Sequence, residues 1–215
     1  MSFDLNEIDN IVLDLGGVII DIDPLLTIDA FKNLGAAELV DEEELIKYHQ
    51  ILIDFEVGRI NPHEFYEALC DVLMMEATFE EVFEAWNLTL LDIPDERRDV
   101  IRKLSKYFDL YLLSNTNEIH IRTLYQLEKR DFDEEFLLEN FDDQYLSFRK
   151  GCRKPDAEIF NLVLMDHQLD PERTLFVDDV KENLQGAIEV GMKVHHLDLL
   201  KDDSIVKLFA EVPEN

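Results

Sequence analysis

Asp14 is the first residue of the chain whose type and setting suit chemistry. It follows the apolar run 11–13 and precedes Gly16 and Gly17. The run is too short for a buried helix, so we expect a buried strand whose carboxyl end presents Asp14 to a cleft. Ligands of open α/β sheets bind just beyond the carboxyl ends of the strands. Asp14 is therefore a candidate nucleophile or metal ligand, although an ordinary turn can also hold an aspartate there.

Three later segments also place polar residues where a predicted strand ends or a helix begins. They are Ser114 and Asn115 after the apolar run 110–113, Lys154 before Pro155, and Asp178 and Asp179 after the run 175–177. Taken singly, each has an ordinary explanation as a helix cap, a solvated surface cation or acids near a helix N-terminus. If the strands are parallel, however, all of these side chains converge with Asp14 on one cleft.

The elements that position these residues alternate between strand and helix. Besides the first strand, we expect strands near residues 110–113, 145–148, 174–177 and 194–197, with helices between them. This alternation predicts an α/β fold with a parallel sheet. Residues 131–143 are acidic, and we expect a solvated helix and loop there.

Residues 21–91 show a helical pattern instead. Three residue pairs have the spacing of a reciprocal N-terminal helix cap, namely Asp41 with Glu44, Asn61 with Glu64, and Thr78 with Glu81. This block is far longer than an ordinary connection between strands. We therefore expect a core domain of residues 1–20 and 92–215, with a small helical cap domain of residues 21–91 inserted in it.

The composition limits the classes of partner. The 215 residues include 49 acidic and 20 basic ones, which gives a formal net charge of −29, and 47% are hydrophobic. Such a surface repels phosphate backbones, so we expect neither nucleic acid nor an anionic membrane as a partner. A phosphate site would need local neutralisation by a metal, a lysine or backbone N–H groups.

The cysteines, the first ten residues and the length of the apolar runs bear on the cellular location of the protein. Cys70 and Cys152 do not make a disulfide scaffold, and residues 1–10 do not resemble a secretory signal. No apolar run approaches the length of a membrane span. We expect a cytoplasmic protein, either a monomer or a homodimer.

The four segments together resemble the motifs of the haloacid dehalogenase superfamily, whose members are mostly phosphatases. Asp14 in IVLDLGGVIIDID is similar to the nucleophile motif, Ser114 in YLLSNTN to the second, Lys154 in RKPDAEIF to the third, and Asp178-Asp179 in LFVDDVKENLQGA to the fourth. The wording DLGGV and KPDAEIF most resembles a bacterial subgroup that includes a glucose-1-phosphate phosphatase. The resemblance implies a Rossmann-like core with a helical cap.

The resemblance also implies a role for each residue. Asp14 would attack phosphorus and form an aspartyl-phosphate intermediate. Magnesium would be held by Asp14, the carbonyl of Gly16, and the pair Asp178 and Asp179, of which either could ligate directly. The phosphoryl oxygens would be bound by Gly16, Gly17, Ser114, Asn115 and Lys154, and Lys154 would keep the acids ionised. The expected substrate is a small phosphorylated metabolite.

Gly16 departs from the family pattern, because the family's phosphatases usually carry a second aspartate there as general acid and base. A positioned acid contributes about 10²–10⁴ in rate, so its absence is costly for an alkoxide leaving group. We expect a preference for sugar 1-phosphates, whose leaving group needs little protonation. Alternatively, a cap side chain or a water held by Asp21 or Asp23 replaces the acid.

Two other functions fit the same motifs. A metal-independent haloacid dehalogenase would keep the aspartate nucleophile, but without a metal Asp178 and Asp179 would repel its anionic substrate. A catalytically weakened protein that binds a phosphorylated ligand would also tolerate Gly16.

Overall fold

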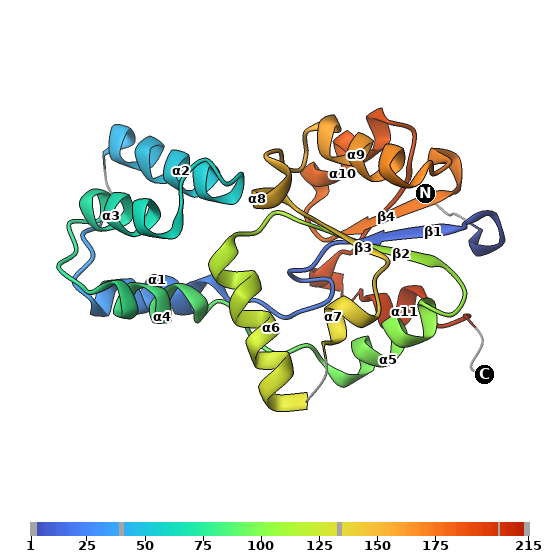
Figure 1. Ribbon diagram of the computed structural model, residues 1–215, viewed down its shortest axis with the longest axis horizontal. Helices are drawn as coiled ribbons and strands as arrows, with labels where there is room; N and C mark the ends of the chain where they lie inside the picture. The colour runs from blue at the N-terminus through green and yellow to red at the C-terminus, as the bar shows by residue number, and fades with distance from the viewer. Residues whose placement is uncertain (1–3, 39–40, 133–134, 202, 213–215) are drawn as a thin grey trace.

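The centre of the computed structural model is a parallel sheet. The structure describes residues 4–38, 41–132, 135–201 and 203–212. The sheet has five strands in the order β3-β2-β1-β4-β5 (Figure 1). The strands are β1 Asn10–Leu13, β2 Asp109–Ser114, β3 Asp143–Leu146, β4 Thr174–Asp178 and β5 Lys193–His196. All neighbours pair in parallel, so the predicted α/β fold is confirmed.

Helices cover both faces of the sheet (Figure 1). One face packs against α5 Asp95–Leu104, α6 Glu118–Phe132, α7 Phe136–Glu139 and α11 Ile205–Leu208, and the other against α9 Ala157–His167 and α10 Leu184–Glu189. Alternate residues of β1 serve the two faces: Ile11 and Leu13 belong to the first cluster and Val12 to the second. Burial on both faces explains why residues 11–13 of this strand are all apolar.

Short helical turns complete the core. They are η1 Leu5–Glu7, α8 Ser147–Lys150, η2 Pro171–Arg173, η3 Lys181–Asn183 and η4 Leu199–Lys201. Across the described ranges, none of the helices is both long enough and apolar enough to span a membrane.

Of the five helices described between β1 and β2 in the chain, the first four stand beside the sheet (Figure 1). They are α1 Pro24–Asn33, α2 Glu42–Glu56, α3 Pro62–Val72 and α4 Phe79–Asn87, and we call them the cap. They share a hydrophobic cluster of their own, in which Phe65 and Leu69 of α3 are fully buried. The division of the chain into two domains at residues 20/21 and 91/92 stays a prediction.

The predicted helix caps are largely confirmed. Asn61 and Thr78 each form the full reciprocal cap with the glutamate three residues later. Asp41 also caps its helix, but its side chain accepts a hydrogen bond from the backbone N–H of Glu43, so the predicted pairing with Glu44 is replaced by a simpler cap.

The predicted strand at residues 145–148 is misplaced by two residues. β3 ends at Leu146, and Ser147 begins the short helix α8. The hydroxyl of Ser147 donates to the carbonyl of Thr116 and accepts from its N–H, which diverts the chain from the sheet. In the acidic stretch 131–143, α6 extends to Phe132 and α7 forms a single turn, while residues 133–134 lie outside the described ranges.

The cap is anchored on helix α6. Ile119 inserts into the cap's hydrophobic cluster, and the rings of Trp86 and His120 stack with centroids 5.0 Å apart. Burial lowers the pKa of His120 to about 4, so its ring is neutral at pH 7. Nδ1 accepts from the amide of Asn117 at 3.1 Å, which leaves the proton on Nε2 to donate to the carbonyl of Trp86 at 3.1 Å. Cap and core are thus joined by packing and by an oriented hydrogen bond.

Gly186 on α10 offers a test of this packing. An added Cβ would lie 2.0 Å from the carbonyl oxygen of Pro155 and 2.7 Å from the ring of Phe160. Gly186→Ala should therefore lower the free energy of unfolding by about 1–3 kcal/mol, despite the higher helix propensity of alanine. Chemical denaturation measures this. The control Gln185→Ala, on the exposed side of the same helix, should change it by less than about 0.5 kcal/mol. Equal stability of the two variants would contradict the close packing.

Candidate active site

A buried lysine and two carboxylates meet at the carboxyl edge of the sheet. The ammonium of Lys154 lies 2.5 Å from Oδ1 of Asp14 and 2.7 Å from Oδ2 of Asp178, and it donates to the carbonyl of Leu113 at 3.0 Å. Lys154 is 1% exposed and Asp178 is fully buried. The residues come from three segments far apart in the sequence, so the predicted convergence is present in the structure.

Asn115 holds the lysine segment in place through its side chain. Its Nδ2 donates to the carbonyl of Lys154 and its Oδ1 accepts from the backbone N–H of Lys154, both at 2.9 Å. Ser114 is buried at the end of β2, directly before this residue. The loop after β2 therefore lies at the edge of the charged cluster, and it also fixes the position of the Lys154 backbone.

Asp178 is oriented by residues of its own loop. Its Oδ1 accepts from the N–H of Val180 at 2.7 Å, and the amide of Asn183 donates to both of its oxygens at 3.2 and 3.0 Å. Sequence reasoning missed Asn183, and also Ser147, which braces the loop after β2. The available signal was weak, because a polar residue at the start of a helix is usually only a cap.

Asp14, Asp178 and Asp179 form a potential metal site. One oxygen from each carboxylate lies within 4.8 Å of the others. Hard cations such as Mg²⁺ favour such oxygen donors. Because Asp178 is already engaged by Lys154 and Asn183, the half-buried Asp179 is the better placed of the pair to ligate directly.

The charges of this cluster do not balance. Burial raises the pKa of Asp14 to about 7; Lys154 opposes this rise and the charge of Asp178 adds to it. Burial also raises the pKa of Asp179, again with a contribution from Asp178. Burial alone would lower the pKa of Lys154, but the two carboxylates outweigh it and hold that pKa above its ordinary value. Three carboxylates and one ammonium give the cluster an excess of negative charge, which a divalent cation would offset.

The two glycines after Asp14 have different surroundings. Gly17 has a φ of +73°, and a Cβ there would lie 2.5 Å from Oδ2 of Asp179, so only glycine allows this approach. Its N–H donates to the carbonyl of Ile20 at 2.8 Å and is used within the loop. At Gly16 a Cβ would lie 3.2 Å from Cδ1 of Ile22. An added side chain would therefore pack tightly against Ile22, which would have to shift by a few tenths of an ångström.

The acids considered as replacements are engaged elsewhere. Asp21 forms an ion pair with Arg97 at 2.8 Å. Asp23 caps helix α1 through the N–H of Leu25. Both lie on the chain segment that leads from the core into the cap. Their contacts give Asp21 and Asp23 structural roles in this segment.

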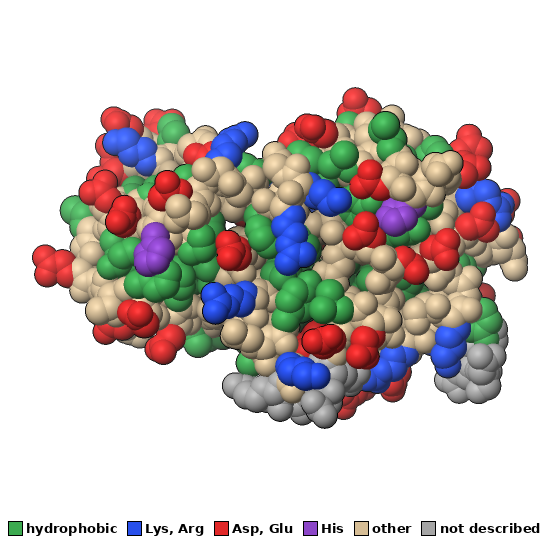
Figure 2. Space-filling model, in the orientation of Figure 1, with side chains coloured by type: hydrophobic (Ala, Val, Ile, Leu, Met, Phe, Trp, Pro, Cys, Tyr) green, Lys and Arg blue, Asp and Glu red, His purple; other side chains and the backbone are tan. Residues whose placement is uncertain are grey.

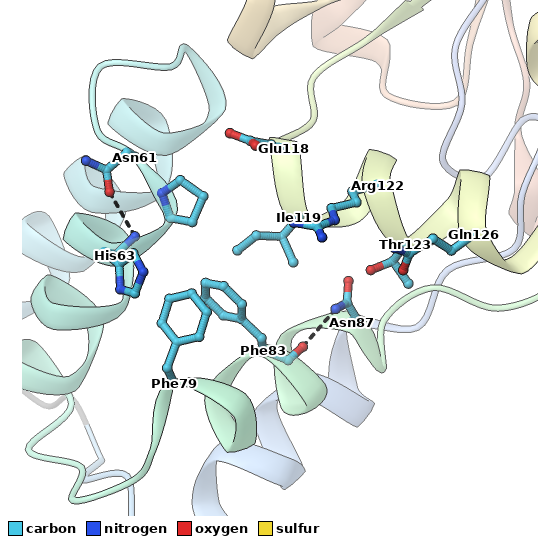
Figure 3. Close-up of a pocket in the computed structure, with 11 residues that line it drawn as sticks. Asn61, His63, Phe79, Phe83, Asn87, Glu118, Ile119, Arg122, Thr123 and Gln126 are labelled. Atoms are coloured by element: carbon cyan, nitrogen blue, oxygen red, sulfur yellow. Dashed lines mark hydrogen bonds between the residues drawn. The ribbon is translucent and has the colours of Figure 1, made fainter.

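Cavities lie along the boundary between cap and core. One of about 650 Å³ is lined by residues of α3, α4 and α6, and Figure 3 shows Phe79 and Phe83 on one side of it and Ile119 and Arg122 on the other. A second, of about 290 Å³, lies between the end of α2 and Phe148. Small-molecule sites commonly occupy such boundaries. Figure 2 shows acidic side chains over both lobes of this face and several Lys and Arg side chains near their boundary.

Comparisons with known proteins agree with this geometry. The family model described as haloacid dehalogenase-like hydrolase matches residues 8–191. A D-ribitol-5-phosphate phosphatase of Bacteroides thetaiotaomicron is 37% identical over 190 residues, which cover 86% of this chain and 90% of that protein.

Solved structures show the same relationship. A family enzyme of Bacteroides thetaiotaomicron, in complex with magnesium and inorganic phosphate, is 34% identical with a TM-score of 0.77, and the match covers 88% of this chain and 93% of that one. A hydrolase from Porphyromonas gingivalis is 33% identical with a TM-score of 0.77, over 88% and 91% of the two chains. The extent of the family match, together with these relatives, shows that the chain belongs to the haloacid dehalogenase-like hydrolases.

Proposed function

We propose that the protein is a Mg²⁺-dependent phosphatase that hydrolyses a small sugar or sugar-alcohol phosphate. The observation that supports this best is the contact of Lys154 with Asp14 beside two further carboxylates, because it combines a nucleophile, a cation for phosphoryl oxygens and a set of metal ligands. The relative that acts on D-ribitol 5-phosphate supports the substrate class.

In the proposed reaction the carboxylate of Asp14 attacks phosphorus. A P–O bond to the aspartate forms as the bond to the substrate's alcohol oxygen breaks, and that oxygen takes a proton from water. Water then attacks phosphorus of the aspartyl-phosphate, which releases inorganic phosphate and restores the Asp14 carboxylate. The Ser114 hydroxyl and the Asn115 N–H bind the phosphoryl oxygens, while the Lys154 ammonium, whose three N–H groups contact Asp14, Asp178 and the carbonyl of Leu113, supplies positive charge beside them. The side chain of Asn115 keeps Lys154 aligned for this task.

The metal would be held by Asp14, the carbonyl of Gly16 and Asp179, with Asp178 ligating directly or through water. A bound Mg²⁺ would supply positive charge to the phosphoryl oxygens and relieve the repulsion among the acids. The spacing of the three carboxylates and their excess of negative charge support this assignment.

The surroundings of Gly16 favour a leaving group that needs little protonation. Ile22 occupies the space next to Gly16, and Asp21 and Asp23 are used in structural contacts. Within the proposed substrate class this favours sugar 1-phosphates, whose anomeric oxygen leaves more readily than a primary alkoxide. The relative's substrate is a 5-phosphate, so the two arguments differ on the position of the ester.

The alternatives have less support. In a metal-independent dehalogenase, the buried Asp178 and the adjacent Asp179 would repel a haloacid anion. A binding protein without turnover would not need the nucleophile and the lysine in contact.

Asp14→Asn tests the covalent route. The amide is a poor nucleophile, so kcat for phosphate-ester hydrolysis should fall by about 10³-fold or more, while the fold is kept. Steady-state assays with Mg²⁺ and thermal unfolding measure both effects. Asp109→Asn, at the exposed start of β2, is the control and should retain activity. Undiminished hydrolysis by Asp14→Asn would show that Asp14 is not the nucleophile.

Magnesium binding should depend on pH. The pKa of Asp14 is raised to about 7 without metal, so protons compete with the cation below that pH and not above it. The apparent Kd for Mg²⁺ should therefore be about tenfold lower at pH 8 than at pH 6. Calorimetric titration with MgCl₂ measures this, and proton release at pH 6 should accompany binding.

EDTA should abolish turnover and Mg²⁺ should restore it. Activity that persists in EDTA would favour the dehalogenase-type chemistry instead.

The ester position is decided by a substrate panel. With Mg²⁺, kcat/KM should be higher for glucose 1-phosphate than for glucose 6-phosphate or D-ribitol 5-phosphate, because Gly16 provides no acid. Equal or greater turnover of the 6-phosphate would rule out the anomeric preference. In the double variant Gly16→Asp with Ile22→Ala, which supplies an acid and the space for it, the advantage of the 1-phosphate should shrink.

A further inference from the structure

An ion pair between cap and core lies beside the catalytic cluster and has no role in the proposed chemistry. Glu56 is the last residue of α2, and Arg153 directly precedes Lys154. Oε2 of Glu56 lies 3.1 Å from Nη2 of Arg153, and the two side chains are 29% and 30% exposed. The pair is thus partly shielded but reachable by a ligand.

The pair is held in a fixed relation to the nucleophile. Arg153 is joined to the backbone that Asn115 clamps, and the ammonium of Lys154 contacts Asp14. On the cap side, the backbone of Gly58 packs so closely on Phe148 that a Cβ at Gly58 would lie 2.3 Å from the Phe148 carbonyl oxygen. The end of α2 is therefore docked on the core.

Glu56 also responds electrostatically to the catalytic centre. Burial raises the pKa of its carboxyl, and the charges of Arg153 and then Lys154 oppose that rise. The charge of the catalytic lysine therefore reaches Glu56. The pair thus lies close to the lysine that contacts Asp14.

The hydrogen-bonding capacity of the pair is not exhausted. Nε of Arg153 is buried and, among the residues that the structure describes, has no hydrogen-bond partner. Such a buried donor is unfavourable, so the guanidinium is not fully satisfied by Glu56, and its exposed part is open to a ligand oxygen. The second oxygen of Glu56 adds an acceptor beside it. The cavity of about 290 Å³ lined by Phe55, Gly58 and Phe148 adjoins the same end of α2.

We propose that Glu56 and Arg153 bind the hydroxyl groups of a neutral polyol chain whose phosphate is held at Lys154. The carboxylate accepts from a hydroxyl, and the exposed part of the Arg153 guanidinium donates to a hydroxyl oxygen. Because the pair carries no net charge, it does not compensate the desolvation of a second charged group, whereas uncharged hydroxyl groups can bond to both partners. It thus selects sugar and sugar-alcohol phosphates over phosphorylated acids. This assignment rests on the proposed phosphatase activity.

The test compares esters with and without hydroxyl groups. The variants Glu56→Gln and Arg153→Lys are assayed with D-ribitol 5-phosphate, with p-nitrophenyl phosphate, which has no hydroxyl groups, and with 3-phosphoglycerate, which carries a carboxylate. Each variant should lower the ratio of kcat/KM for ribitol 5-phosphate over p-nitrophenyl phosphate at least tenfold, mainly through KM. Glu56→Gln should also raise the ratio of phosphoglycerate over ribitol 5-phosphate turnover.

The matched control is Glu43→Gln on the same helix, where Glu43 pairs with Lys47 on the exposed surface. It should leave both ratios unchanged. Equal losses on all three esters in the Glu56 and Arg153 variants would indicate a structural role and overturn the inference, as would unchanged ratios. If the unmodified protein hydrolyses none of the esters, the proposed function fails, whereas turnover with unaltered selectivity in the variants refutes only the hydroxyl clamp.

Discussion

The burial of the Lys154 ammonium is the constraint on which the rest of the site depends. A buried cation without partners is strongly unfavourable, and here two carboxylates and a backbone carbonyl surround it. Those partners stand at the ends of β1, β2 and β4, so the lysine can be satisfied only when three strands end at the same level. The register of the parallel sheet provides this, since Leu13 pairs with both Leu112 and Val177. The fold and the charge cluster are therefore one arrangement.

The sequence predicts the meeting point well because parallel strands impose it. Asp14, Ser114 and Asp178 each follow an apolar run, and parallel strands bring such ends to one edge without detailed knowledge of packing. The reciprocal caps of Asn61 and Thr78 are local patterns and were equally accessible. The ends of buried strands and the starts of capped helices can thus be predicted from the local sequence alone.

Other features depend on contacts between distant segments and leave no local pattern. The side chain of Asn115 holds the backbone of Lys154, 39 residues away, which its sequence neighbours do not reveal. The early end of β3 arises because Ser147 bonds across to Thr116. Ile22 beside Gly16 and the docking of Glu56 on Arg153 both depend on how the cap meets the core, and periodicity within a helix does not specify that meeting.

The excess of negative charge in the cluster determines what a phosphate dianion needs in order to bind there. With a formal charge of −29 on the chain and three carboxylates around one ammonium, a phosphate dianion is repelled until positive charge is added. The same field attracts a divalent cation, which Asp14, Asp178 and Asp179 would hold and which would offset the charge that repels the phosphoryl group. The cap meets the core at the Trp86–His120 and Glu56–Arg153 contacts. An acidic surface and a phosphate substrate are compatible for this reason: the acids that repel the substrate are those that would hold the cation.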